Sequence, residues 1–166
     1  KGYINLLDAL KFIDKSILKN IVFNFAGKFY DNKLENDFLK RVDCYDNVFF
    51  HGEVSDQDKF KLFQESHVFC IPTQFLEGQP ISILEAYASG SFVLSTNKPG
   101  IRDIFENNEN GFSIENGEPE SISKEIEKVY KNLSYCEDIV LKNYKNCLKK
   151  YKQEKYFEEL EKIFES

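Results

Sequence analysis

The chain of 166 residues contains no methionine and no tryptophan, and it has only four prolines and two histidines. It also lacks any apolar run approaching the roughly 18 to 20 residues that a membrane-spanning helix requires. Its 28 acidic residues outnumber the 22 lysines and arginines, which gives a net charge of -6. Nucleic-acid-binding surfaces are normally basic, so this balance argues against nucleic acid as a partner. We expect a soluble protein that holds any phosphate group by local contacts.

The cysteines are few and widely spaced. Cys44, Cys70, Cys136 and Cys147 form no C-x-x-C pair, and no histidine lies near them at the spacing of metal ligands. Free, reduced thiols are therefore expected, and they are typical of a cytoplasmic protein.

The first residues lack both an initiator methionine and a signal-like segment, and a helical pattern is already under way from Tyr3 to Leu10. We therefore expect a fragment of a longer protein, with sequence missing upstream. With 42% hydrophobic residues, the chain can bury one core. The expected organisation is a single domain over residues 1–166.

Strand-like and helix-like segments alternate along the chain. Short apolar runs bounded by glycine or turn residues predict strands at 21–27, 47–52, 67–72, 91–96 and 112–114. Apolar residues spaced by three and four predict helices at 3–14, 34–43, 55–66 and 80–88. Such units give an α/β fold, a Rossmann-like doubly wound parallel sheet with helices on both faces. Charged amphipathic patterns after residue 118 predict a C-terminal tail of two or three helices.

Two glutamates stand out around the helix at 80–88. Glu77 lies with Gly78 in the loop after a strand, and Glu85 lies within the helix, with seven residues between them. A helical wheel of about 100° per residue places Glu85 away from the apolar stripe. The stripe expected to be buried consists of Ile83, Leu84, Tyr87 and Ala88. Either glutamate alone would be interpreted as a solvated carboxylate, but the pair suggests a site.

The start of this helix suits a phosphate group. Pro80 is expected as the first helical residue, because its fixed φ suits that position. The free amide groups from Ile81 and Ser82 onward would then direct partial positive charge toward the crevice above the sheet. Ligands of doubly wound sheets bind in that crevice.

This arrangement resembles the retaining glycosyltransferases of the large GT-B family 4, whose signature is two glutamates separated by seven residues between strand and helix. The agreement extends to EGQP and LEAYASG around the glutamates, to FAGKF and VFFHGEVS upstream, and to KPGIRDIFENNENGFSI downstream. It covers most of residues 1–130. The resemblance implies the C-terminal, nucleotide-sugar-binding half of a GT-B enzyme. The N-terminal acceptor domain and the first strand would then be missing.

The resemblance also implies roles for charged residues. Glu85 would accept hydrogen bonds from the ribose hydroxyls of the donor nucleotide, and Glu77 would act beside the transferred sugar as a catalytic residue. Lys1 occupies the position of a catalytic lysine that faces the pyrophosphate in the family, where a cation stabilises the leaving diphosphate. The arginine that accompanies this lysine in the family is absent from the chain.

Further donor-binding residues follow from the same resemblance, mostly through backbone groups. They are Gly78, Gln79, Pro80, Ile81 and Ser82 in the loop and first helical turn, and Gly27 after the first strand. The partner implied is a nucleotide sugar, together with the N-terminal domain. No cofactor and no metal are expected.

The expected reaction is transfer of a sugar from a nucleoside diphosphate sugar to an acceptor hydroxyl with retention, in surface polysaccharide synthesis. The isolated fragment should bind nucleotide but be inactive. Two alternatives stay open, namely half of a GT-B nucleotide-sugar epimerase and a non-catalytic binding module with a decayed pocket. The lysine-rich residues 142–162 are compatible with a solvated helix face or with peripheral membrane contact.

Overall fold

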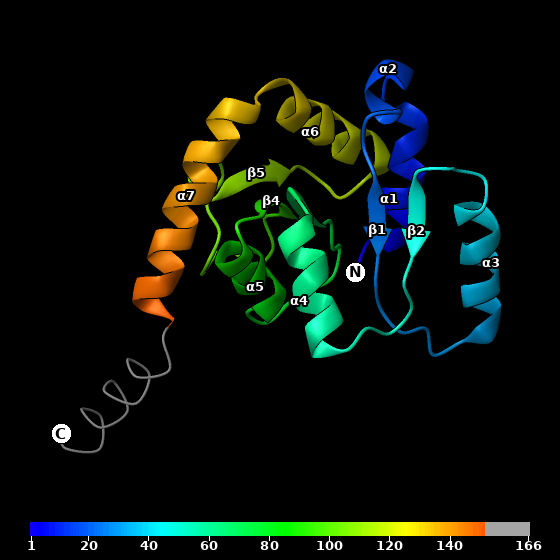
Figure 1. The fold of residues 1–166 in the computed structure, drawn as a ribbon, viewed down its shortest axis with the longest axis horizontal. Helices are drawn as coiled ribbons and strands as arrows, with labels where there is room; N and C mark the ends of the chain where they lie inside the picture. The colour runs from blue at the N-terminus through cyan, green and yellow to red at the C-terminus, as the bar shows by residue number, and fades with distance from the viewer. Residues whose placement is uncertain (152–166) are drawn as a thin grey trace.

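The computed structural model describes residues 1–151, in which parallel strands alternate with helices (Figure 1). The strands are β1 Phe23–Phe25, β2 Val48–Phe50, β3 Val68–Ile71, β4 Phe92–Thr96 and β5 Gly111–Ile114. The helices are α1 Tyr3–Ala9, a short 3-10 helix Leu10–Phe12, α2 Lys15–Leu18, α3 Asn32–Val42, α4 Asp56–Glu65, α5 Ile81–Ser89, α6 Pro119–Lys131 and α7 Leu133–Lys150. Every predicted strand is present, so the α/β prediction is confirmed.

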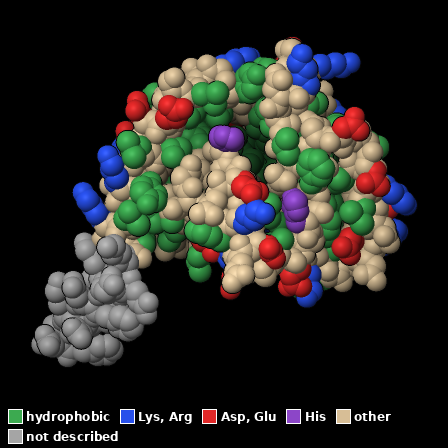
Figure 2. Space-filling model, viewed as in Figure 1, with side chains coloured by type: hydrophobic (Ala, Val, Ile, Leu, Met, Phe, Trp, Pro, Cys, Tyr) green, Lys and Arg blue, Asp and Glu red, His purple; other side chains and the backbone are tan. Residues whose placement is uncertain are grey.

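The parallel strands lie in two separate sheets. β1 pairs with β2, and β3 pairs with β4, which also pairs with β5; all these pairs are parallel. Within the described residues no backbone ladder joins β1 to β3. The space-filling view has a hollow in this region, with hydrophobic side chains on its walls (Figure 2). The parallel pairing agrees with the predicted Rossmann-like fold, but the sheet is interrupted between β1 and β3.

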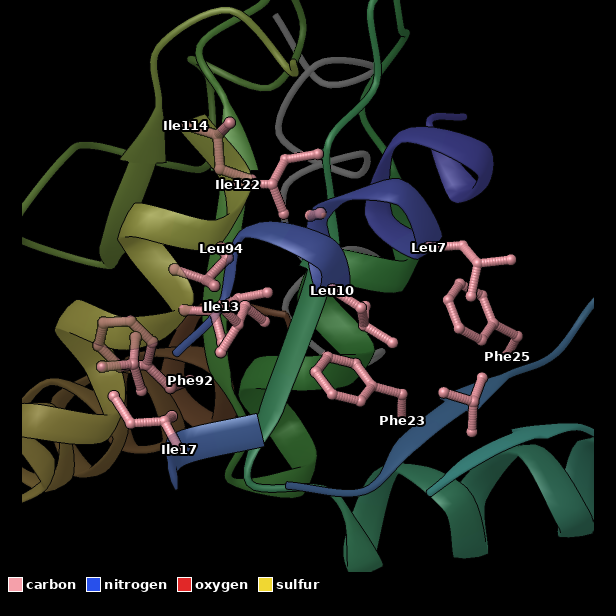
Figure 3. Packing of buried hydrophobic residues seen from close by; sticks show 14 of the residues in the cluster. Leu7, Leu10, Ile13, Ile17, Phe23, Phe25, Phe92, Leu94, Ile114 and Ile122 are labelled. Carbon is pink, nitrogen blue, oxygen red and sulfur yellow. The ribbon is translucent and has the colours of Figure 1, made fainter. Parts of the chain in front are cut away.

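One apolar core nevertheless connects the two parts of the sheet. Phe23 of β1 and Leu94 of β4 belong to the same buried cluster, and Leu10 packs in it from the segment after α1 (Figure 3). Residues 3–13 thus bridge the division from one face. The two sheets therefore share one buried apolar cluster.

β4 lies at the centre of the three-stranded sheet, and both of its faces are covered. Phe92 and Leu94 belong to the cluster that includes residues of α1, α3 and α6. Val93, which points to the opposite face, belongs to a second cluster with residues of α5 and α7. This confirms the prediction of helices on both faces.

Helix α5 starts one residue later than predicted. Pro80 has an extended backbone (ψ 108°) and is the N-cap, so it precedes the helix instead of forming its first residue. The buried residues of α5 are Ile83, Ala86 and Tyr87, whereas the predicted stripe residue Ala88 is exposed. Ala88 follows Ile83 by five residues, which rotates it about 140° away from the buried stripe. Gly90 ends the helix in the left-handed conformation that glycine favours at helix C-termini.

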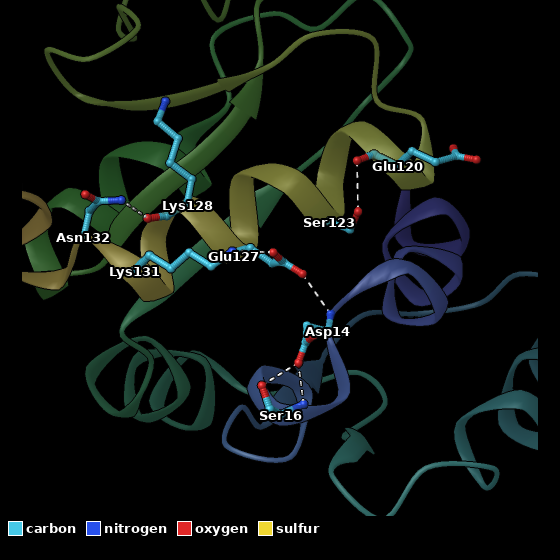
Figure 4. A network of polar contacts seen from close by, with 8 residues as sticks. All are labelled: Asp14, Ser16, Glu120, Ser123, Glu127, Lys128, Lys131 and Asn132. Carbon is cyan, nitrogen blue, oxygen red and sulfur yellow. Dashed lines mark hydrogen bonds and ion pairs between the residues drawn. The ribbon is translucent and has the colours of Figure 1, made fainter.

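The predicted helical tail is present as α6 and α7. The Glu127 carboxylate of α6 accepts a hydrogen bond from the backbone amide of Asp14 at 2.8 Å, which ties this helix to the start of α2 (Figure 4). On α7, the buried Asn143 exchanges hydrogen bonds with Asn110, just before β5. The remainder of the predicted tail, residues 152–166, lies outside the described residues. None of the helices in residues 1–151 combines the length and apolar character needed to cross a bilayer.

Removing the buried side chain of Leu94 should strongly destabilise the fold. Leu94 is fully buried at the centre of the sheet, so Leu94→Ala should lower the free energy of unfolding by about 2 to 5 kcal/mol. Leu34→Ala provides a matched control, because Leu34 is 55% exposed on α3 and its truncation should cost about 0.5 kcal/mol or less. Urea unfolding followed by circular dichroism measures both. Equal losses in the two variants would contradict the assignment of the core.

Candidate functional site

The β3–α5 loop, residues 72–80, is held in place by close backbone contacts from distant segments. A Cβ on Gly2 would lie 2.3 Å from the carbonyl oxygen of Pro72, and a Cβ on Gly100 would lie 2.3 Å from that of Glu77. Gly117 makes a third approach, with its Cβ position 2.9 Å from the Pro72 oxygen. All three glycines have positive φ. No other residue type fits these contacts without displacing the loop.

Glu77 is fixed from two sides within this loop. Its Oε2 lies 3.0 Å from Nζ of Lys1, and its Oε1 accepts a hydrogen bond from Oγ1 of Thr73 at 2.9 Å. Thr73 is fully buried, and its carbonyl oxygen accepts a 2.6 Å hydrogen bond from the hydroxyl of Thr96 in β4. Only 11% of the Glu77 side chain is exposed, compared with 67% for Lys1. The structure therefore brings together the two residues predicted to be catalytic.

These contacts keep Glu77 ionised. Burial alone would raise the pKa of this carboxyl group, but hydrogen bonds from Lys1 and Thr73, together with the positive charge of Lys1, outweigh burial and lower the pKa below its usual value. A group whose pKa is lowered in the folded protein stabilises the fold above its normal pKa. That contribution is lost as the pH falls through the lowered value.

The start of α5 presents unpaired amide groups beside Glu77. The helix has no side-chain cap, and the amides of Ile81 and Ser82 make no hydrogen bond to another described residue. Gly78 and Gln79 are exposed just before them, whereas Pro80 is buried. Free amides and the positive end of the helix dipole together favour an anionic group at this point. Pro80 has no N–H to contribute.

Glu85 faces α4 and is not in contact with Glu77. Its Oε1 lies 2.8 Å from Nζ of Lys59, and 32% of its side chain is exposed. The sequence did not single out Lys59, because it lies 26 positions before Glu85 on a different helix.

Gly27 lies just beyond the carboxyl end of β1. Its amide donates a 2.8 Å hydrogen bond to the carbonyl oxygen of Gly52, which follows β2. A Cβ at Gly27 would meet nothing within 4 Å, so the backbone there borders open space. A ligand therefore has room beside Gly27. Gly27 itself does not touch the β3–α5 loop.

The chain matches a known family over nearly its whole length. The family model described as "Glycosyl transferases group 1" covers residues 1–155. The chain belongs to the glycosyl transferases group 1 family. This confirms the resemblance drawn from the two glutamates and their flanking motifs.

Two curated bacterial relatives of this glycosyltransferase chain are named as glycosyltransferases. The capsular polysaccharide biosynthesis glycosyltransferase CapM of Staphylococcus aureus is 33% identical over 118 residues, covering 71% of this chain and 30% of the relative. An uncharacterized glycosyltransferase of Haemophilus influenzae is 31% identical over 103 residues, covering 61% of this chain and 28% of the relative. The chain thus spans about a third of the length of these relatives.

Solved structures support the fold assignment. HepE of Anabaena, in complex with UDP-glucose, superposes with a TM-score of 0.85 at 16% identity, covering 99% of this chain and 45% of HepE. The C-terminal domain of a glycosyl transferase group 1 family protein from Francisella tularensis gives a TM-score of 0.66 at 16% identity, covering 90% of this chain and 94% of that domain. The Rossmann-like GT-B architecture of the glycosyltransferase chain is therefore confirmed.

The remaining metal-ligating and nucleophilic side chains lie outside the loop described above. Within residues 1–151, no three histidine, cysteine, aspartate or glutamate side chains converge as metal ligands would. Burial raises the pKa of the Cys70 thiol to about 12, which keeps it protonated and unreactive. The roles of Glu77, Lys1, Glu85 and the loop residues, and the absence of a cofactor, stay predictions.

Removing the Thr73 hydroxyl should raise the pKa of Glu77. In Thr73→Val the carboxylate loses one of the two hydrogen bonds that favour its charged form, so protonation becomes easier. An NMR titration that follows the side-chain carboxyl carbon of Glu77 measures this change. Thr73→Ser keeps the hydroxyl and should leave the pKa near that of the unmodified protein. An unchanged pKa in the valine variant would show that the hydroxyl does not act on Glu77.

Proposed function

We propose that the full-length protein is a retaining glycosyltransferase and that this chain is its donor-binding half. The observation that carries the proposal is the position of Glu77, held by Lys1 and Thr73 beside the free amides of α5. A carboxylate and its paired cation thus lie in the loop that leads directly into the unpaired amides of α5. That combination suits a sugar joined to a diphosphate.

The anionic diphosphate would bind at the start of α5. Its oxygens would accept hydrogen bonds from the amides of Ile81 and Ser82. The ammonium group of Lys1 has three N–H donors, so it can pair with Glu77 and still donate to a phosphate oxygen. Positive charge there would stabilise the nucleoside diphosphate as it leaves the sugar.

The two glutamates would hold the sugar and the nucleoside. Glu85 would accept hydrogen bonds from the two vicinal hydroxyls of the ribose, since a carboxylate can accept several at once. Glu77 would lie near the transferred sugar, where its negative charge orients hydroxyls or stabilises positive charge developing at the anomeric carbon. Retention of configuration at that carbon follows from the family resemblance.

A second domain would supply the acceptor site. The part that this chain matches is 28% and 30% of the two curated relatives and 45% of HepE, which supports a longer protein. The division between β1 and β3 supports a further strand there, leading into α1. Lys1 lies beside Glu77, past the carboxyl end of β3, so such a strand would run parallel to β3.

The setting of the reaction is proposed from the relatives and the cysteines. The name of the Staphylococcus aureus relative supports a role in surface polysaccharide synthesis. All four cysteines are free thiols, which supports a reducing compartment such as the cytoplasm.

The chain should bind one nucleoside diphosphate, and Glu85→Ala should weaken that binding about ten- to hundredfold, because charge-assisted hydrogen bonds to the ribose are lost. Calorimetric titration with UDP, GDP and ADP measures the Kd and identifies the base. UDP is the first ligand to test, because HepE was solved with UDP and with UDP-glucose. Glu65→Ala on the exposed face of α4 is the control and should change the Kd less than twofold. Failure of all three diphosphates to bind would overturn the proposal.

The isolated chain should transfer no sugar to any acceptor, since the acceptor site would lie in the other domain. Labelled nucleotide sugars incubated with the chain and a panel of sugar acceptors test this. The full-length protein is the positive control. A glycosylated product from the chain alone would contradict the proposal that the acceptor site lies in the other domain.

A further inference from the structure

The contact between Lys59 and Glu85 joins two helices. Nζ of Lys59 on α4 lies 2.8 Å from Oε1 of Glu85 on α5, and it also lies 3.5 Å from Oδ1 of Asp56. The hydrogen bond from Lys59 and its charge pairing with Glu85 raise the pKa of the lysine. Lys59 is 40% exposed and Glu85 is 32% exposed, so solvent and a ligand both have access to the pair.

Stability is a weak explanation for this contact. Ion pairs with this degree of exposure contribute about 0 to 1 kcal/mol to folding. Lys61, on the same helix, pairs with its neighbour Glu65 one turn away at 3.9 Å. Lys59 instead reaches across to the one residue of α5 proposed to bind the ribose.

The Glu85 carboxylate has enough acceptor positions to bind Lys59 and a ribose at the same time. A carboxylate offers about four acceptor positions, of which Lys59 occupies one and two vicinal hydroxyls would occupy two. The ammonium group has three N–H donors. One points to Glu85 and a second is within reach of Asp56, which leaves the third for a ligand oxygen.

We propose that Lys59 is a positioning residue for the nucleotide: it orients the Glu85 carboxylate and donates a hydrogen bond to a ribose hydroxyl oxygen. The proposal rests on the function proposed above, because it requires that Glu85 binds the ribose. It adds a fourth charged residue to the donor site, after Lys1, Glu77 and Glu85, and extends that site from α5 onto α4.

The variant Lys59→Met tests the proposal, because methionine keeps much of the side-chain length and removes the charge. Its Kd for UDP, measured by calorimetry, should be about five- to twentyfold higher than that of the unmodified chain. Lys61→Met, two residues away on α4, is the matched control and should stay within twofold. Lys59→Arg should recover most of the affinity. Thermal unfolding checks that each variant is folded, and Lys59→Gln replaces the methionine variant if that one is not.

A second ligand separates positioning at the ribose from general attraction to the diphosphate. With 2′,3′-dideoxyuridine diphosphate, which lacks both ribose hydroxyls, Lys59→Met should cause little loss of affinity. In the Glu85→Ala background, Lys59→Met should likewise add little further loss for UDP. Equal losses for the two ligands would overturn the proposal.

The outcomes also distinguish the two proposals. If Glu85→Ala weakens UDP binding while Lys59→Met leaves it unchanged or tightens it, the inference about Lys59 is wrong and the proposed function stands. If no diphosphate binds the unmodified chain, the proposed function is wrong and the inference about Lys59 is wrong with it.

Discussion

The close packing of the β3–α5 loop against the backbones of Gly2, Gly100 and Gly117 is the constraint on which the site depends. These glycines come from the start of the chain, from the loop after β4 and from the loop after β5. Together they fix the path of the loop, so that Glu77 lies between Lys1 and Thr73 with little freedom to move. A preorganised carboxylate of this kind needs no further ordering when a ligand arrives.

The two glutamates of the signature have different surroundings, and this difference suits different tasks. Glu77 is largely buried, and its charge is maintained by a cation and a buried hydroxyl. Glu85 is more exposed and is paired with Lys59 of another helix. The first arrangement favours a fixed charge beside a reacting centre. The second favours a contact whose partners can be shared with a ligand.

Much of the fold could be predicted from the sequence because short apolar runs and helical spacing are local signals. The Ser55 N-cap of α4 and the Gly90 end of α5 agree with local capping rules. Long-range contacts leave no such signal. The pairing of Lys59 with Glu85, the hydroxyl of Thr73 on Glu77, and the division between β1 and β3 depend on how distant segments pack. The resemblance, in contrast, selected Lys1 and Glu77, and the fold places them in contact.

The central claim is that a donor diphosphate binds at the start of α5 with the sugar beside Glu77. The most direct measurement is an amide NMR titration of the isotope-labelled chain with UDP. The account predicts that the largest shifts occur at the amides of Gly78, Gln79, Ile81 and Ser82, around the start of the helix. Shifts confined to other parts of the chain, with Ile81 and Ser82 unaffected at saturation, would contradict it.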